Sequence, residues 1–316
     1  LHPRVRRQRQ MCIRDRHKRG EDVNGWLIVD KPRGTGSTDV VNFTRRFFNA
    51  RKNGHCGTLD PFATGVLPVA FGEATKLIPY VTDADKEYEF VLQWGEATST
   101  GDPEGDVIAA SEKIPSREEI LAVLPSFIGR IEQIPPVYSA IKINGQRAYT
   151  LARKGEAVEM PSRMVEIYAL ELLEELSGNR AKFRASCSKG TYVRTLGQDI
   201  ALRLGTVGHL RELRRTKCGK FDLKDAIKLE TLKNMVHIDT LTEVLLPIET
   251  YLRDIAVIAV SEADAAKLKL GQGLSPRAYG IENADAYDAV VVCGGKMVAI
   301  VRIDNRKIAP VRVFNL

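Results

Sequence analysis

One short segment of the sequence concentrates the side chains that could do chemistry. Residues 55–68 read HCGTLDPFATGVLP, and they place one carboxylate, Asp60, in a turn bounded by glycine and proline among small and apolar residues. An Asp that precedes a proline commonly starts a turn. A carboxylate held in a partly dry pocket can instead act as a nucleophile. The residue types alone leave both interpretations open.

The longer run around Asp60 favours the second interpretation through a resemblance. It is similar to the motif GTLDPxATG of the TruB family of tRNA pseudouridine synthases, in which the Asp is the nucleophile. Four further segments resemble motifs of the same family, in the family's order: NGWLIVDKPRG at 24–34, QIPPVYSAIKINGQRAYTLARKG at 133–155, CSKGTYVRTL at 187–196 and GHLRELRRT at 208–216. Five specific motifs in order exceed what chance supplies, and we therefore expect Asp60 to be catalytic.

The resemblance implies an isomerase that converts uridine 55 in the T loop of tRNA to pseudouridine. The bond from N1 of the base to the ribose breaks, the base turns, and C5 bonds to the same sugar. This isomerisation needs no redox step and no external energy, so we expect no cofactor and no metal. A nucleophilic carboxylate can hold the reaction together while the base is detached. The uridine must first be flipped out of its stack.

The resemblance assigns roles to three further residues, Arg194 and Tyr192 in the segment at 187–196 and Tyr88 in KEYEF at 86–90. The family's TYxR arginine pairs with the nucleophile, and here it is Arg194, whose guanidinium would keep Asp60 charged and oriented. Tyr88 and Tyr192 match positions that line the uridine pocket, where an aromatic face can stack on a flipped base. The phenol of Tyr88 could also help to remove the C5 proton. Without the resemblance, Arg194 and Tyr88 would be assigned to structural roles.

Two more candidates come from the resemblance. Leu213 matches a family residue at the uridine pocket, although a lone Leu usually belongs to a core. His55 matches a His that contacts the RNA loop and helps to fill the space that the target base vacates. We expect His55 to recognise RNA and not to act as a general base. Lys31, in a Lys-Pro turn, stays outside the expected catalytic set.

The composition sets limits on where the protein works. A chain of 316 residues is long enough for two domains, and it has no apolar stretch that could span a bilayer. Its five cysteines are scattered and form no CxxC pair. This argues against a zinc site and a disulfide framework and fits a reducing cytosol. From the resemblance we expect a cytoplasmic monomer that binds the tRNA T arm without an obligate protein partner.

The net charge of +7 says little about RNA binding by the folded part. Residues 1–23 contain 8 basic and 3 acidic residues, whereas the whole chain has 47 and 40, so the rest is nearly balanced. The basic run from Arg211 to Lys220 and the C-terminal unit are candidates for contacting phosphates. Most charge runs, however, form a solvated face.

Hydrophobic periodicity predicts a mixed order of strands and helices, which is typical of an α+β fold. Strands are expected at 26–29, 86–94, 164–173, 181–188, 257–260, 289–292, 297–303 and 311–314. Three helices are expected to be capped by Ser37 or Thr38, by Ser116 and by Ser261, and a fourth to run from Arg194 to Leu204. The resemblance implies a pseudouridine synthase-type core, which is a mixed, largely antiparallel sheet flanked by helices. A small, β-rich, PUA-like domain would follow it.

We therefore expect three parts. Residues 1–23 would be a basic tail that is disordered or not native to the fold, 24–250 the catalytic pseudouridine synthase domain, and 251–316 the PUA-like RNA-binding domain.

Three alternatives were weighed against this assignment. A guide-RNA-dependent synthase acting on ribosomal RNA shares the Asp motif, but the C-terminal unit here is short and lacks Lys-rich extensions. A non-catalytic protein that binds tRNA and helps it to fold would not require Asp60, Tyr88 and Arg194 together. A carboxylate hydrolase would usually need a second acid, and none lies in the Asp60 motif.

Overall fold

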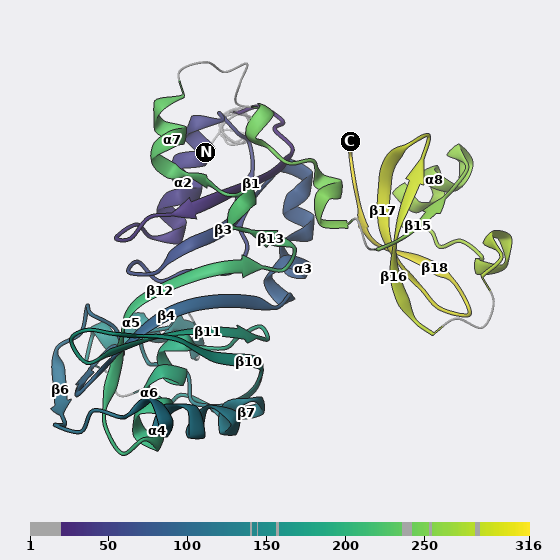
Figure 1. Ribbon diagram of the computed structural model, residues 1–316. Helices are drawn as coiled ribbons and strands as arrows, with labels where there is room; N and C mark the ends of the chain where they lie inside the picture. The colour runs from purple at the N-terminus through teal and green to yellow at the C-terminus, as the bar shows by residue number, and fades with distance from the viewer. Residues whose placement is uncertain are drawn as a thin grey trace, which may run out of the picture.

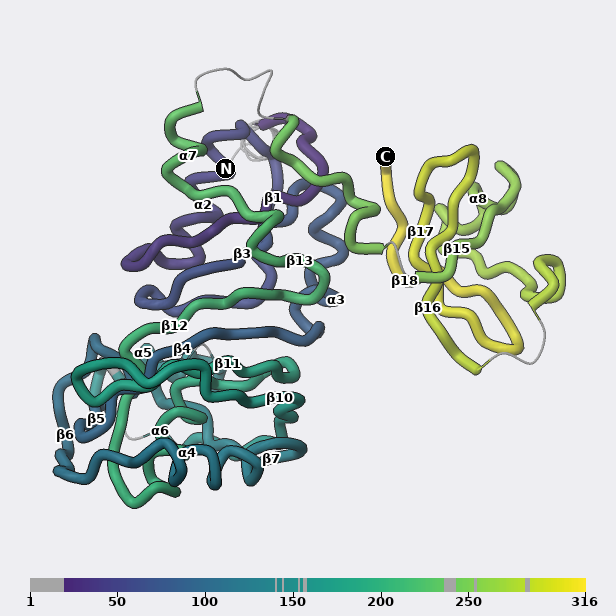
Figure 2. The backbone as a smooth tube through the Cα atoms, in the orientation of Figure 1, coloured from purple at the N-terminus to yellow at the C-terminus, as the bar shows by residue number. Residues whose placement is uncertain are grey.

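The computed structural model has two units side by side, each built on its own sheet (Figure 1, Figure 2). The structure describes residues 20–316 except 140, 144, 156–157, 236–241, 253–254 and 282–284. The strands of the larger sheet are β1 (Gly25–Lys31), β2 (Asn53–His55), β3 (Thr64–Phe71), β4 (Lys86–Trp94), β7 (Gly129–Gln133), β10 (Arg163–Leu176), β11 (Arg180–Cys187), β12 (Gly208–Cys218), β13 (Phe221–Asp222) and β14 (Ile227–Lys228). The helices are α2 (Ser37–Phe47), α3 (Ile78–Asp83), α4 (Arg117–Val123), α5 (Ala148–Arg153), α6 (Val193–Arg203), α7 (Leu229–Asn234) and α8 (Glu262–Lys269).

The larger sheet is mixed and largely antiparallel, which confirms the predicted fold class. Its strands follow the order β14-β1-β3-β12-β4-β11-β10-β7, with β2 beside β3 and β13 beside β12. Among these described pairs, only β1–β14 and β3–β12 are parallel. The β3–β12 pairing covers just two positions, Thr64 with Arg214 and Gly65 with Arg215. The two strands therefore meet only where the Asp60 loop enters β3.

Most of the predicted elements are present, and the start of one helix differs. Ser116 caps α4, since its Oγ accepts from the backbone N–H of Glu119 at 3.3 Å and its own N–H donates to the Glu119 carboxylate at 2.8 Å. The prediction that Ser37 or Thr38 caps α2 is wrong, because Gly36 holds the cap position. The Ser37 hydroxyl is instead engaged by the backbone of Leu59.

Two central strands, β3 and β12, were not predicted. Seven of the eight residues of β3 are buried, although it contains Gly65 and Pro68, which usually interrupt strands. Pro68 fits because its carbonyl still accepts from the Cys56 N–H at 2.9 Å. In β12, the charged residues interrupt the alternation of polar and apolar residues by which a strand is predicted.

Close packing places α6 against the middle of the sheet. This helix packs on β12 and β4. A methyl group on Gly197 would come within 2.8 Å of the Leu210 side chain, so only a glycine allows this approach. Arg194 lies one turn earlier on the same helix. The tight contact therefore fixes the height of its guanidinium above the sheet.

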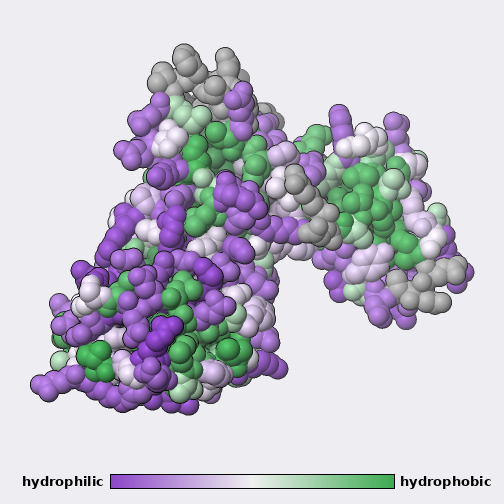
Figure 3. All heavy atoms as spheres, viewed as in Figure 1, coloured by the Kyte–Doolittle hydropathy of each residue, from purple (hydrophilic) through white to green (hydrophobic). Residues whose placement is uncertain are grey.

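The smaller unit consists of β15 (Ala256–Ala259), β16 (Tyr287–Cys293), β17 (Lys296–Ile303), β18 (Ile308–Val313) and α8. This confirms a β-rich C-terminal domain. An apolar cluster connects it to the larger unit, and the buried Phe314 at the chain end belongs to that cluster. Lys76 donates to the carbonyl of Val313 at 2.7 Å, and the Asn315 N–H donates to Glu73 at 2.8 Å. In the face shown in Figure 3, polar side chains cover most of the larger unit, while apolar ones gather over the smaller sheet.

The range expected for the basic tail, 1–23, overlaps the described fold at its end. Residues 1–19 lie outside the described residues. Residues 20–23 are part of the fold, because Glu21 exchanges backbone hydrogen bonds with Asn49 and Arg51 at 2.6 and 2.9 Å, and Val23 packs against the core. Within the described part of the chain, no helix is long and apolar enough to cross a membrane.

The close approach of β3 and β12 can be tested at Gly65. Its φ is +100°, and an added Cβ would lie 2.2 Å from the Arg215 carbonyl oxygen. We expect Gly65→Ala to lower the free energy of unfolding by about 2 kcal/mol or more. Gly294→Ala is the matched control, because Gly294 also has a positive φ, but a Cβ added there would have no other part of the chain within 4 Å. It should cost about 1 kcal/mol. Equal shifts of the thermal midpoint in both variants would contradict this packing argument.

Candidate active site

The Asp60 loop is held by side chains from the first strand and helix. The Ser37 hydroxyl donates to the Leu59 carbonyl at 2.9 Å and accepts from the Leu59 N–H at 2.8 Å. Lys31, fully buried, donates to the carbonyls of Pro61 at 3.2 Å and Thr35 at 2.7 Å. The loop before β3 is therefore rigid on both sides of the carboxylate.

Arg194 joins Asp60 to a second carboxylate. Its Nε lies 3.0 Å from Asp60 Oδ2 and its Nη1 lies 3.3 Å from Asp102 Oδ2. The Nε–H is not aligned closely enough on Asp60 for a hydrogen bond, so this contact is an ion pair. Nη1 and Nη2 also donate to the carbonyls of Thr100 and Tyr138, at 2.9 and 2.8 Å. The guanidinium is 3% exposed, and these acceptors fix its position.

Burial raises the pKa of the Asp60 carboxyl above its usual range, the charge of Arg194 opposes this, and the charge of Asp102 adds to it. Although protein surrounds the residue, 35% of its side-chain surface is open to the cavity in front of it. Burial also lowers the pKa of Lys31 to about 8, against the pull of Asp60. Asp60 is thus a partly desolvated carboxylate whose ionised form depends on the cations around it.

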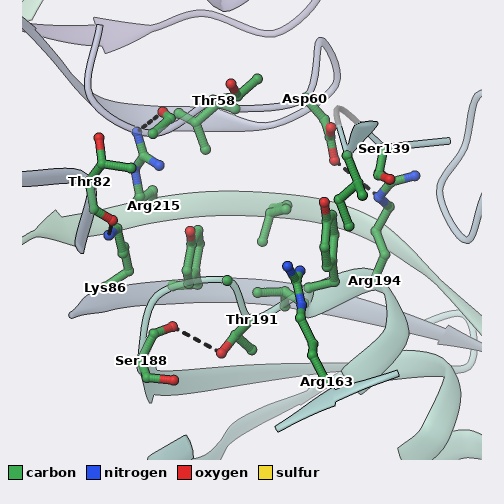
Figure 4. Close-up of a pocket in the computed structure, with 18 residues that line it drawn as sticks. Thr58, Asp60, Thr82, Lys86, Ser139, Arg163, Ser188, Thr191, Arg194 and Arg215 are labelled. Carbon is green, nitrogen blue, oxygen red and sulfur yellow. Dashed lines mark hydrogen bonds and ion pairs between the residues drawn. The ribbon is translucent and has the colours of Figure 1, made fainter. Parts of the chain in front are cut away.

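A cavity of 350 Å³ lies in front of Asp60 (Figure 4). Asp60 and Arg194 point toward one another at one end of it. The wall contains four of the predicted site residues besides Asp60: Tyr88, Tyr192, Arg194 and Leu213. One cavity therefore collects side chains from the Asp60 loop, β4, β12 and the start of α6.

Strand pairing explains why Tyr88 faces this cavity. Tyr88 lies opposite Arg215 of β12 and Ala185 of β11. Burial raises the pKa of the Tyr88 phenol to about 12, and the charge of Arg215 only partly offsets it. The phenol is therefore protonated at neutral pH. Arg215 is itself buried and donates to the carbonyls of Val66 at 2.8 Å and Gly57 at 3.1 Å.

His55 differs from the other predicted residues, since it does not line the cavity. It lies in β2, opposite Val69 of β3. Burial, reinforced by the charges of Arg215 and Arg147, lowers the pKa of its imidazole. His55 Nδ1 has no hydrogen-bond partner among the described residues. The imidazole is therefore neutral near pH 7, and its Nδ1 is buried.

Sequence reasoning missed Asp102 and the buried position of Arg215. Nothing in the run around Asp102 marks it, and only the fold brings it to Arg194. The basic run at 211–220 is one candidate for contacting phosphates, but much of it is engaged within the protein. Arg215 is buried in the cavity wall, and Arg214 donates to both carboxylate oxygens of Asp30, at 3.0 and 2.9 Å.

Comparison with known families agrees with these motifs. Residues 45–193 match the profile described as TruB family pseudouridylate synthase (N terminal domain). Residues 194–253 match the one described as tRNA pseudouridylate synthase B C-terminal domain. The chain belongs to the TruB family of pseudouridylate synthases. It is therefore an isomerase of the pseudouridine synthase type.

Relatives and solved structures extend over nearly the whole chain. A "tRNA pseudouridine synthase B" of Caulobacter vibrioides is 46% identical, with 95% of this chain and 99% of the relative covered. The protein of that name from Bradyrhizobium diazoefficiens is 48% identical, with 99% and 91% covered. The solved "Cbf5-Nop10-Gar1 Complex" contains a chain with a TM-score of 0.68 at 26% identity, covering 92% of this chain and 84% of that one.

The role of Asp102 can be tested through the pH dependence of the rate. Because the Asp102 charge raises the pKa of Asp60, Asp102→Asn should lower that pKa and move the acidic limb of kcat/KM to lower pH. The plateau rate should also fall by about tenfold or more, since Arg194 loses one acceptor that fixes it.

Asp106→Asn is the matched control for this prediction, because Asp106 is exposed in the same loop. It should leave both the limb and the plateau unchanged. An acidic limb that stays in place or moves upward in Asp102→Asn would contradict the electrostatic account of the site.

Proposed function

We propose that this chain isomerises uridine 55 in the T loop of tRNA to pseudouridine, with Asp60 as the nucleophile. The observation that carries the proposal is an Asp60 carboxylate that faces a 350 Å³ cavity and lies 3.0 Å from a buried Arg194. The names of the 46–48% identical relatives support tRNA as the substrate class. We further propose that the protein acts in the cytoplasm as a monomer without an obligate partner.

Each cavity residue has a role in this reaction. Asp60 forms the transient covalent bond that retains the detached base or sugar, and Arg194 keeps the carboxylate ionised and oriented. Tyr88 and Tyr192 offer aromatic faces to the flipped base, and Leu213 adds apolar contact. Because the pKa of Tyr88 is about 12, its phenol is better suited to donate a hydrogen bond than to accept the C5 proton.

RNA binding outside the cavity completes the proposal. His55 lies in β2, directly before the Asp60 loop, and we assign it a contact to the RNA loop. We assign residues 24–250 to the catalytic domain and 251–316 to a PUA-like RNA-binding domain. In support of this division, β15 to β18 form a sheet of their own.

The alternatives can be separated by one experiment. Unmodified tRNA transcript is incubated with the protein alone, and pseudouridine at position 55 is mapped chemically. We expect product without additives. Product that requires a guide RNA would support the rRNA-type alternative, and product that requires a metal ion would contradict cofactor-free catalysis. Binding without any product would support the tRNA-folding alternative.

The nucleophile is tested by Asp60→Asn, which keeps the size of the side chain and removes its charge. We expect pseudouridine formation to be abolished, while the dissociation constant for tRNA changes by less than about threefold. Asp39→Asn, an exposed residue on α2, is the control and should retain full activity. Near wild-type turnover by the Asp60 variant would exclude this carboxylate as the nucleophile.

Tyr88 is tested by two substitutions. Tyr88→Leu removes the aromatic face, so turnover should fall far more than affinity, by about 10- to 100-fold if one stacking contact of about 1–3 kcal/mol is lost in the flipped state. Tyr88→Phe retains the face and should keep more of the rate. Equal losses of turnover and affinity in the Leu variant would indicate that Tyr88 serves packing alone.

A further inference from the structure

The side chain of Arg163, at the start of β10, has donors that the reaction at Asp60 does not use. Its Nε and Nη2 atoms are buried and have no hydrogen-bond partner among the described residues. Arg163 lines the cavity and points into it from the wall opposite the Asp60 loop (Figure 4). Buried donors without acceptors are unfavourable, and more so on a charged group. These two N–H-bearing nitrogens therefore have no acceptor among the described residues, and a ligand in the cavity can supply one.

The other cationic side chains of the cavity are already engaged. Arg194 is held by two carboxylates. Arg215 donates to backbone carbonyls of the Asp60 loop and β3, and Lys86 donates to carbonyls at the end of α3. Among the described cations that line this cavity, Arg163 is thus the one with two buried N–H-bearing nitrogens that have no acceptor.

Neighbouring groups hold Arg163 in this position. Its Cζ lies 4.6 Å from the centroid of the Tyr192 ring, so the guanidinium rests against an aromatic side chain. Gln133, the β7 partner of Arg163, exchanges two hydrogen bonds with the Tyr192 backbone, at 3.3 and 3.0 Å. Behind Arg163, Gly190 has no side chain, and a Cβ there would lie 3.5 Å from Cζ. A side chain ordered in advance loses little entropy when it binds.

We propose that Arg163 binds a backbone phosphate next to the flipped uridine and thereby positions that nucleotide over Asp60. The inference rests on the proposed function, since it requires an RNA substrate in this cavity. Two adjacent N–H groups on a guanidinium edge match two oxygens of an oxyanion. In RNA, the phosphate is the anionic group that presents two such oxygens. Arg163 is then a substrate-positioning residue, and it takes no part in bond making.

The test uses an RNA hairpin of the T arm in which the phosphates flanking the target uridine are replaced, one at a time, by neutral methylphosphonates. In the wild-type protein, one of these replacements should lower kcat/KM by about 10- to 100-fold. In Arg163→Met the unmodified hairpin should already show this loss, and the same replacement should have little further effect. Such non-additivity is the signature of a direct contact.

Two variants control for charge and folding. Arg130→Met removes an exposed arginine from the neighbouring strand β7, and it should keep the wild-type sensitivity to the methylphosphonate. Arg163→Lys retains the charge without the two-pronged edge, so it should keep the fold and recover part of the rate. If Arg163→Met does not fold, the same cycle is run with the Lys variant.

The outcomes separate this inference from the proposed function. Additive losses at every flanking phosphate would overturn the role of Arg163 while leaving the reaction intact. The same conclusion follows if the Arg130 and Arg163 variants behave alike. Failure of the wild-type protein to convert the unmodified hairpin or full tRNA would overturn the proposed function itself.

Discussion

The buried guanidinium of Arg194 is the contact on which the site depends. It holds Asp60 and Asp102, which come from two different loops, and it also donates to backbone carbonyls of Thr100 and Tyr138. A carboxylate withdrawn from water without such a partner would take up a proton. Four segments of the chain must therefore meet at one cation for Asp60 to remain ionised in a partly dry cavity.

The sheet provides that meeting point because its central strands β3 and β12 pair at only two positions. The two-position contact of β3 with β12 brings the Asp60 loop beside Arg215, while β4 presents Tyr88 from the next strand. Ser37 of α2 and Lys31 at the end of β1 fix the loop. The Asp60 carboxylate is held in place and the space before it is open, which is what the proposed positioning of a flipped base requires.

Much of this arrangement could be predicted, and the failures have physical causes. Alternation in 86–94 and the cap at Ser116 predict β4 and α4 because each depends on neighbours in sequence. Gly65 and Pro68 argue against a strand at β3 in the sequence. Whether a strand tolerates them depends on which backbone groups its neighbours pair, and only the folded sheet determines this. The charged residues of β12 hide its strand pattern in the sequence. Arg215 can be buried there only because it donates to the carbonyls of Val66 and Gly57, which are distant in sequence.

The order of amino acids alone indicates the family, and it predicts Asp60 as the nucleophile among residue types suited to a flipped base. Tertiary structure decides which charges are satisfied within the protein: Asp102 shares Arg194, Arg214 pairs with Asp30, and Arg163 keeps buried donors that no described residue pairs. The reason is that the free energy of a charged group depends on its burial and on neighbours that only the folded chain brings together.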